Sequence, residues 1–282
     1  MPVKLVDALS EMLSGWQEDL PEPWQPVLGD VRLGLDACDP ELELDHWEPI
    51  FPARHGRIFP GAPKSAHVFR AFDSITPADV RCVVLGQDPY PAPDFATGRA
   101  FEAGNVAAWR ELDKMFSKSV RAFLQLVCAA RTGNAAYARS FADWPMLLAD
   151  IERGAVDLEA PEQLADRWVK DGVLLLNSSF TLSRFAVEVD PHQSRGHLPV
   201  WRPLILRVLE HLARSGRTIV FLGFGDAAVE NLRLAGLTQP DAPLATIQRA
   251  HPAAADAVLA LENPFVACNR FLERMGARPV AW

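Results

Sequence analysis

Four short apolar runs, separated by longer segments with helical periodicity, constrain the fold of this chain more than any other feature. The runs have the length and composition of buried strands. They occupy residues 82–85, 173–176, 218–222 and 244–248. Continuously apolar strands that alternate with helices are typical of a parallel sheet covered on both faces. We therefore predict an α/β fold, a three-layer α/β/α sandwich around a central, mainly parallel four-stranded sheet.

The segments around the runs are expected to supply the covering helices. A last helix should begin at the cap Asn263 and end by Gly276, and Ser65 is placed to cap a helix of its own. Apolar residues at helical spacing predict the remaining helices over 6–13, 31–38, 112–130, 161–170 and 201–213. Residues 1–57 should thus form a helical N-terminal portion packed on the rest of residues 1–282, which we expect to be one domain.

The composition excludes several classes of protein. No window approaches the ~18 consecutive apolar residues of a membrane span. The N-terminus lacks the order of a signal peptide, so we expect a cytoplasmic protein with no membrane partner. A net charge of −8 argues against non-specific coating of nucleic acid, because phosphate binding draws on clustered Lys and Arg, but it leaves room for a local basic cleft. Nothing suggests a symmetric interface, and a monomer is expected.

The cysteines do not form a metal-binding pattern. The chain has four, and none of them belongs to a C-x-x-C pair: Cys38, Cys82, Cys128 and Cys268. Zinc and iron–sulfur sites commonly use such pairs. We therefore predict reduced, mostly buried thiols, no metal and no cofactor.

Polar side chains follow three of the predicted strands. Residues 82–85 run into Gly86-Gln87-Asp88-Pro89-Tyr90, residues 173–176 into Asn177, and the last strand is soon followed by His251. Each has an ordinary structural explanation when taken singly: a turn cap, a turn former and a structural histidine. In a parallel sheet, however, the carboxyl ends of the strands meet at one edge. We therefore expect these groups to share one site.

The residue types at that edge narrow the chemistry. The amide of Asn177 both donates and accepts, which suits the edge of a pyrimidine or another imide. Asp88 with a neutral His251, and no nucleophilic Ser or Cys between them, does not resemble acyl transfer. Acid–base or electrostatic work on a small planar ligand is the better interpretation, and Tyr90 and Phe101 supply an aromatic wall.

These motifs resemble those of the family 1 uracil-DNA glycosylases. Gly86-Gln87-Asp88-Pro89-Tyr90, Leu174-Leu175-Leu176-Asn177 and His251-Pro252 occur in the family's order and at roughly its spacing, and the resemblance covers about residues 46–282. It implies hydrolysis of the bond between uracil and deoxyribose after the nucleotide is flipped out of the stack, with uracil-containing DNA as partner and free uracil as product. Relative to the family, residues 134–159 look like an insertion of unknown role.

The resemblance also implies a role for each pocket residue. Asp88 would orient the attacking water and stabilise the oxocarbenium-like sugar, while neutral His251 would donate a hydrogen bond to uracil O2. Asn177 would read N3–H and O4. Tyr90 would exclude the methyl group of thymine. The remaining two residues complete the uracil site: Phe101 stacks on the base and Gln87 lines the pocket.

The DNA-handling segments depart from the family pattern. Pro91 replaces a common His, Asp226 follows Gly225 where a Ser is usual, the Pro-Pro-Ser turn is not evident near Lys118, and Ala255 stands in place of a leucine that wedges into the minor groove. We expect weaker duplex binding, reliance on other loops or on single-stranded substrate, and poor inhibition by the phage inhibitor that mimics DNA. The residues expected at the DNA are Ser178, Arg195, His197, Gly225 and Ala255.

Two other functions remain open from the sequence. The run Gly223-Phe224-Gly225-Asp226-Ala227-Ala228 matches a dinucleotide-binding turn between a strand and a helix, although no acid ends the next strand. The altered loops would also suit a uracil- or damage-binding protein that kept the pocket and lost turnover. Asp88 and His251 argue against that second alternative.

Overall fold

The computed structural model describes residues 2–57, 59–115, 117–185 and 190–282. Its centre is a four-stranded sheet in the order β4-β3-β5-β6, and every neighbouring pair is parallel. The strands are β3 (Cys82–Gly86), β4 (Val173–Asn177), β5 (Ile219–Phe224) and β6 (Leu244–Arg249). All residues of β3, β4 and β5 are buried, as their apolar sequences require. The four predicted strands are confirmed.

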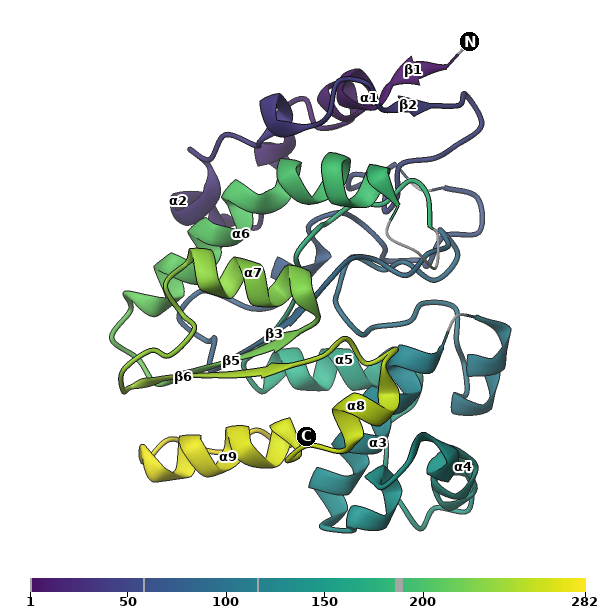
Figure 1. The fold of residues 1–282 in the computed structure, drawn as a ribbon, viewed down its shortest axis with the longest axis vertical. Coiled ribbons are helices and arrows are strands. Elements are labelled where there is room, and N and C mark those ends of the chain that lie inside the picture. The colour runs from purple at the N-terminus through teal and green to yellow at the C-terminus, as the bar shows by residue number, and fades with distance from the viewer. Residues whose placement is uncertain (1, 58, 116, 186–189) are drawn as a thin grey trace.

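Helices cover both faces of this sheet. In Figure 1, α6 (Leu198–Ala213) and α7 (Asp226–Leu234) lie on one side, and α3 (Lys118–Thr132), α5 (Pro161–Lys170) and α9 (Pro264–Arg274) lie on the other. Asn263 caps α9 by accepting from the N–H groups of Phe265 and Val266. The predicted three-layer α/β/α sandwich is confirmed.

The N-terminal portion lies on the outer side of α6 (Figure 1). It contains α1 (Leu5–Met12), α2 (Gln25–Leu28) and a short antiparallel pair, β1 (Val3–Lys4) with β2 (Glu43–Leu44). Leu5, Leu9 and Trp24 are fully buried in the same core as the sheet. This portion is therefore less helical than its periodicity predicts, and residues 31–38 contain only a 3-10 turn at Leu35–Ala37.

The helix expected after Ser65 does not form. The backbone N–H groups of His67 and Val68 bind the carbonyls of Thr97 and Ala53, and only a 3-10 turn follows at Arg70–Phe72. Contacts with distant loops therefore replace helical hydrogen bonds. The helical spacing of the aromatic residues here reflects core packing, because Phe72 lies 4.7 Å from Trp24 between ring centroids. Similarly, α3 starts later than expected, since Trp109–Lys114 is a 3-10 helix.

Residues 134–159 form a short helical segment beside α3 (Figure 1). It comprises α4 (Trp144–Glu152) and the 3-10 turns Ala135–Ala138 and Phe141–Asp143, and it also contacts α8 (Ala255–Leu259). Two cations on α3 contact its rings, since Lys118 lies 5.6 Å from the Phe141 ring and Arg121 lies 5.7 Å from Trp144. None of the helices in the described part of the chain is long and apolar enough to cross a membrane.

Candidate active site

A cavity of about 410 Å³ opens at the carboxyl ends of the strands. Its wall includes all six residues predicted for the catalytic and uracil-binding site: Gln87, Asp88, Tyr90, Phe101, Asn177 and His251. They come from three distant parts of the sequence. The parallel sheet brings them together because their loops all leave the same edge.

The tips of β3 and β4 are joined closely. Gly86 pairs with Asn177 in the sheet, and the Gly86 carbonyl accepts from both the backbone N–H (3.0 Å) and the hydroxyl (2.8 Å) of Ser178. The Ser179 N–H also donates to the carbonyl of Gln87 at 2.9 Å. A Cβ atom on Gly86 would lie 2.8 Å from Asn177 Oδ1, so only glycine allows this approach.

Asp88 is a partly exposed acid with one buried carboxyl oxygen. Burial raises the pKa of its carboxyl group to about 7, although a hydrogen bond with the Gln87 side chain acts in the opposite direction. Its Oδ2 atom is buried and has no hydrogen-bond partner among the residues that the structure describes. Near neutral pH, the site can therefore present a carboxylate with a free acceptor oxygen to a bound ligand or water.

His251 is held neutral with its proton directed outward. Burial lowers the pKa of the imidazole. The Ala253 N–H donates to Nδ1 at 3.2 Å, so the hydrogen bond assigns the remaining proton to Nε2. Gly225, with φ of +90°, lies directly behind this ring, and a Cβ atom there would come within 3.2 Å of His251 Cβ. A neutral imidazole with Nε2–H is a hydrogen-bond donor for a ligand oxygen.

Asn177 and Tyr90 also present polar atoms that lack protein partners. Asn177 is 2% exposed, and within the described ranges no acceptor binds its Nδ2 group. The hydroxyl of Tyr90 is also buried, and it has no hydrogen-bond partner within the described ranges. Burial, together with the charge of Glu102, raises the pKa of the Tyr90 phenol, which keeps it neutral. Since buried polar groups are normally satisfied, these atoms are arranged for a ligand.

Phe101 forms the flat wall of the cavity. Its ring stacks on Phe123 at 4.1 Å between centroids with an interplanar angle of 12°, and Phe224 meets it edge-on at 5.4 Å. Its φ of +58° is uncommon for a residue with a side chain. The surrounding loop must therefore hold this conformation.

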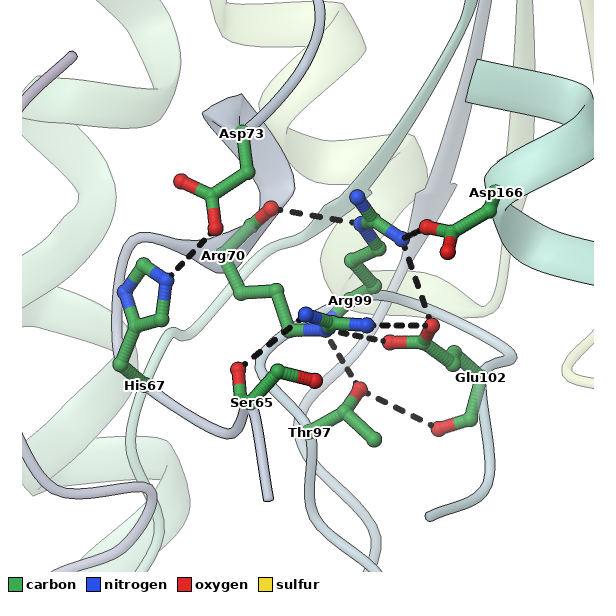
Figure 2. Close-up of polar contacts among 8 residues, drawn as sticks. All are labelled: Ser65, His67, Arg70, Asp73, Thr97, Arg99, Glu102 and Asp166. Carbon is green, nitrogen blue, oxygen red and sulfur yellow. Dashed lines mark hydrogen bonds and ion pairs between the residues drawn. The ribbon is translucent and has the colours of Figure 1, made fainter. Parts of the chain in front are cut away.

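A buried ionic cluster fixes that loop (Figure 2). Glu102 accepts from Arg70 at 2.9 and 3.0 Å and from Arg99 at 3.3 Å, while Arg99 also donates to Asp166 at 2.6 Å. Burial alone would raise the pKa of Glu102, but the hydrogen bond from Arg70 and the charge of Arg99 lower it overall. Thr97 closes the loop by accepting from the Arg99 N–H at 3.2 Å.

Removing the charge of Glu102 should destabilise the fold strongly. Glu102→Gln removes the carboxylate that two largely buried guanidinium groups share and leaves Arg99 with Asp166 alone, a change that typically costs about 3–5 kcal/mol. The free energy of unfolding in denaturant should fall by that amount. Glu230→Gln is the control, because its 2.8 Å pair with Arg233 lies at the surface and should contribute little. Equal losses for the two variants would contradict a structural role for the cluster.

The residues expected at the DNA are less well placed. Ser178, His197 and Ala255 are buried, with at most 1% of each exposed. His197 bonds to Thr181 and Ser183, and burial lowers its pKa to about 3. Arg195 is exposed but pairs with Asp39 at 2.7 Å. None of the five is among the residues that line the cavity, although Gly225 packs against His251 and Ser178 bonds to the carbonyl of Gly86, and both His251 and Gly86 do line it.

Several residues at the cavity were not singled out as site residues from the sequence. Lys118, Ser119, Arg99 and Phe185 all line it. Lys118 and Ser119 lie inside the helix predicted over 112–130, whereas the observed helix begins at Lys118. The family's Pro-Pro-Ser turn, which is not evident near Lys118, was the available signal for this segment. Phe185 lies outside the helices and strands, so the spacing of apolar residues does not predict where its side chain lies.

The turn resembling a dinucleotide site does connect β5 to α7. However, its Gly225 faces His251 Cβ and Gln87 Oε1, at 3.2 and 3.5 Å from the position of a Cβ atom. The following strand, β6, ends at Arg249 rather than at an acid. The space and the ribose partner that a dinucleotide needs are therefore missing at this turn.

The fold and the site define an α/β protein with a pocket at one sheet edge that is lined by a carboxyl group, an imidazole, an amide and aromatic rings. No family model matches the chain. A curated uracil-DNA glycosylase of Exiguobacterium sibiricum is 29% identical over 264 residues, covering 92% of this chain and 97% of that protein. One of Bordetella pertussis is 29% identical over 270 residues, covering 93% and 87%. The chain is thus a homologue of uracil-DNA glycosylases, and the resemblance seen in its motifs is confirmed.

Solved structures agree on the fold. The wild-type UNG of Nitratifractor salsuginis matches with a TM-score of 0.60 at 23% identity, covering 98% of each chain. The uracil-DNA glycosylase of mimivirus matches with a TM-score of 0.53 at 16% identity, covering 83% of this chain and 75% of that one. Both likenesses extend well beyond the pocket motifs.

Proposed function

We propose that this protein is a uracil-DNA glycosylase, which hydrolyses the N-glycosidic bond of a flipped deoxyuridine and leaves an abasic site and free uracil. One observation carries the proposal. Three buried polar atoms, Asp88 Oδ2, Tyr90 Oη and Asn177 Nδ2, lack partners in the described structure and belong to residues that line one cavity. Together with the Nε2–H of His251, they match the needs of a base that leaves as an anion from a cationic sugar.

The chemistry divides between the two titratable groups. The Asp88 carboxylate orients the attacking water and stabilises positive charge as it develops on the sugar. His251 donates from Nε2 to uracil O2, which carries the negative charge of the departing base. A neutral imidazole suffices for this hydrogen bond, so no proton has to be transferred to the base. Burial of both groups strengthens these interactions.

Recognition of uracil depends on the uncharged residues. Asn177 donates to O4 from Nδ2 and accepts from N3–H at Oδ1, whereas cytosine presents the reverse pattern of donor and acceptor. Tyr90 stands against C5 and leaves no room for the methyl group of thymine. Phe101 stacks on the ring, and its support by Phe123 preserves the flat surface.

The ionisation of Asp88 predicts the pH dependence. The carboxylate is the active form, and its pKa is about 7, so kcat/KM should fall below that pH. At pH 5, about two units lower, the loss should be about a hundredfold. Initial rates from pH 4.5 to 9, with circular dichroism at each pH to confirm folding, test this. A rate that stays constant from pH 8 to pH 5 would contradict the raised pKa.

We also propose that the protein handles DNA differently from relatives with a wedge leucine. Ala255 has a small side chain and is 1% exposed at the start of α8, so it is unsuited to insertion between bases. Single-stranded uracil DNA, which needs no unpairing, should therefore be processed faster than duplex. Equal kcat/KM values for the two substrates would contradict this.

The same feature predicts weak inhibition by the phage protein that mimics DNA. This inhibitor is abbreviated UGI, and the structure of a mimivirus UNG Y322L variant has been solved in complex with UGI. Here, the buried Ala255 offers such an inhibitor no protruding apolar side chain. Titration of the enzyme with UGI should leave most activity at a one-to-one ratio. Complete stoichiometric inhibition would contradict the expectation.

Release of uracil from a labelled oligonucleotide tests the function itself. Matched oligonucleotides with thymine, cytosine or hypoxanthine at the same position measure specificity. Only the uracil substrate should yield abasic sites, detected as alkaline strand breaks. Tight binding of uracil DNA without any release of uracil would instead support the alternative function, a binding protein that has lost turnover.

A further inference from the structure

One large apolar side chain is exposed at the candidate active site. Phe185 lines the cavity, and 46% of it remains exposed. Among the described lining residues, the other phenylalanine, Phe101, packs on rings of the core. A single exposed apolar residue is ordinary elsewhere on a protein surface. In the lining of a pocket for a flipped base, the exposed part of Phe185 can contact the rest of the substrate.

The chain segment before Phe185 is firmly anchored. Arg184 pairs with Glu48 at 2.6 Å through Nη2 and donates to the carbonyl of Glu43 at 3.1 Å. The hydroxyl of Ser183 lies between two histidine rings, 3.1 Å from His192 Nδ1 and 2.9 Å from His197 Nε2. The ring of Phe185 therefore follows a fixed segment, so less ordering accompanies its contact with a ligand.

The rest of the described lining offers no comparable surface. Ala253 presents only a methyl group, Pro91 is small, and Tyr90 and Phe101 are more enclosed than Phe185. Lys118 lines the same cavity and supplies positive charge for the backbone of a bound strand. An aromatic ring near a cation is the combination that single-stranded nucleic acid commonly uses, since every base has a face to stack.

We propose that Phe185 stacks on a base adjoining the uracil in the substrate strand and so holds the strand while uracil occupies the pocket. This inference rests on the proposed function, because the neighbour exists only if the ligand is a polynucleotide. Stacking of this kind is tolerant of sequence. Its loss should weaken binding of single-stranded uracil DNA by about 5- to 150-fold.

Anisotropy of a fluorescent single-stranded oligonucleotide with one uracil tests the proposal. Each variant is made together with Asp88→Asn, so that binding is measured without turnover. Phe185→Ala should weaken binding by the stated factor, and Phe185→Tyr should restore it. Phe185→Leu keeps apolar volume without an aromatic face and should remain weak. Trp47→Ala is the matched control, because Trp47 is 69% exposed but does not line the cavity, and it should bind normally.

A change in the substrate separates stacking from other effects. When abasic linkers replace both nucleotides that flank the uracil, Phe185→Ala should no longer weaken binding, because the base it would stack on is gone. A Phe185→Ala variant that binds the intact oligonucleotide as well as Trp47→Ala, or a full-affinity Phe185→Leu, would overturn the proposal. Failure of the wild-type chain to release uracil would reject the proposed function separately, since these binding comparisons do not depend on turnover.

Discussion

Replacing Asp88 with asparagine is expected to lower the single-turnover rate of uracil release by about a thousandfold. The amide has nearly the same shape, but it carries no charge to stabilise the sugar cation and does not act as a base toward water. The cavity should remain otherwise intact, so binding of uracil DNA should change little. The rate is measured on a labelled single-stranded oligonucleotide with enzyme in excess, at pH 8, where most Asp88 carboxyls are ionised.

Thermal stability supplies the control for this variant. Burial raises the pKa of Asp88 from 3.8 to about 7, so ionisation destabilises the native state as the pH rises through that value. Asp88→Asn should therefore melt higher than the wild type at pH 8, and the difference should shrink toward pH 4, where the native carboxyl is protonated. A variant that releases uracil within a few fold of the wild-type rate would contradict the role of Asp88, and lower stability at pH 8 would contradict its buried ionisation.

Replacing Asn177 with aspartate should change which base is removed. Asn177 is 2% exposed, so a carboxyl group in its place would have a raised pKa and would often be protonated. A neutral carboxylic acid can carry its proton on either oxygen, so it can donate to N3 of cytosine and accept from its exocyclic amine, and it can equally donate to O4 of uracil and accept from N3–H. Sites that read hydrogen-bonding groups discriminate by about 10⁴-fold or more, so the expected gain of cytosine release is large.

The measurement is parallel release from oligonucleotides that contain uracil or cytosine at one position. Asn177→Asp should release cytosine detectably, which the wild type should not, and should still release uracil. Asn177→Ala is the control, because it should lose uracil release without gaining cytosine release. Unchanged preference for uracil in the aspartate variant would show that another residue reads the base.

The sheet could be predicted because β3, β4 and β5 are almost entirely apolar and buried, and α5 could be predicted because its amphipathic period is unbroken. The helix predicted after Ser65 does not form, because the backbone there bonds to Ala53 and Thr97. The spacing of apolar residues does not reveal such distant partners. Apolar spacing alone does not distinguish a helix from a loop that buries the same rings. Helix α3 was predicted, but its start was placed too early, because Leu112 and Met115 extend the apolar helical spacing upstream of Lys118.

The pocket was predictable for a different reason. Asp88, Asn177 and His251 follow strands, and parallel strands place such residues at one edge whatever the loops do. The ionic cluster around Glu102 was not predictable, because its partners Arg70 and Asp166 lie 32 and 64 residues away along the chain and no pattern pairs them. Burial of His197 and Ala255 likewise depends on tertiary packing.

We propose that the groups at the strand ends form a working site for uracil excision. The most direct measurement is the initial rate of uracil release from one single-stranded oligonucleotide by the wild type, Asp88→Asn and His251→Ala, purified in parallel and confirmed to be folded. We expect release by the wild type and losses of at least a hundredfold in both variants. Absence of release by the wild type, or equal rates for all three proteins, would contradict it.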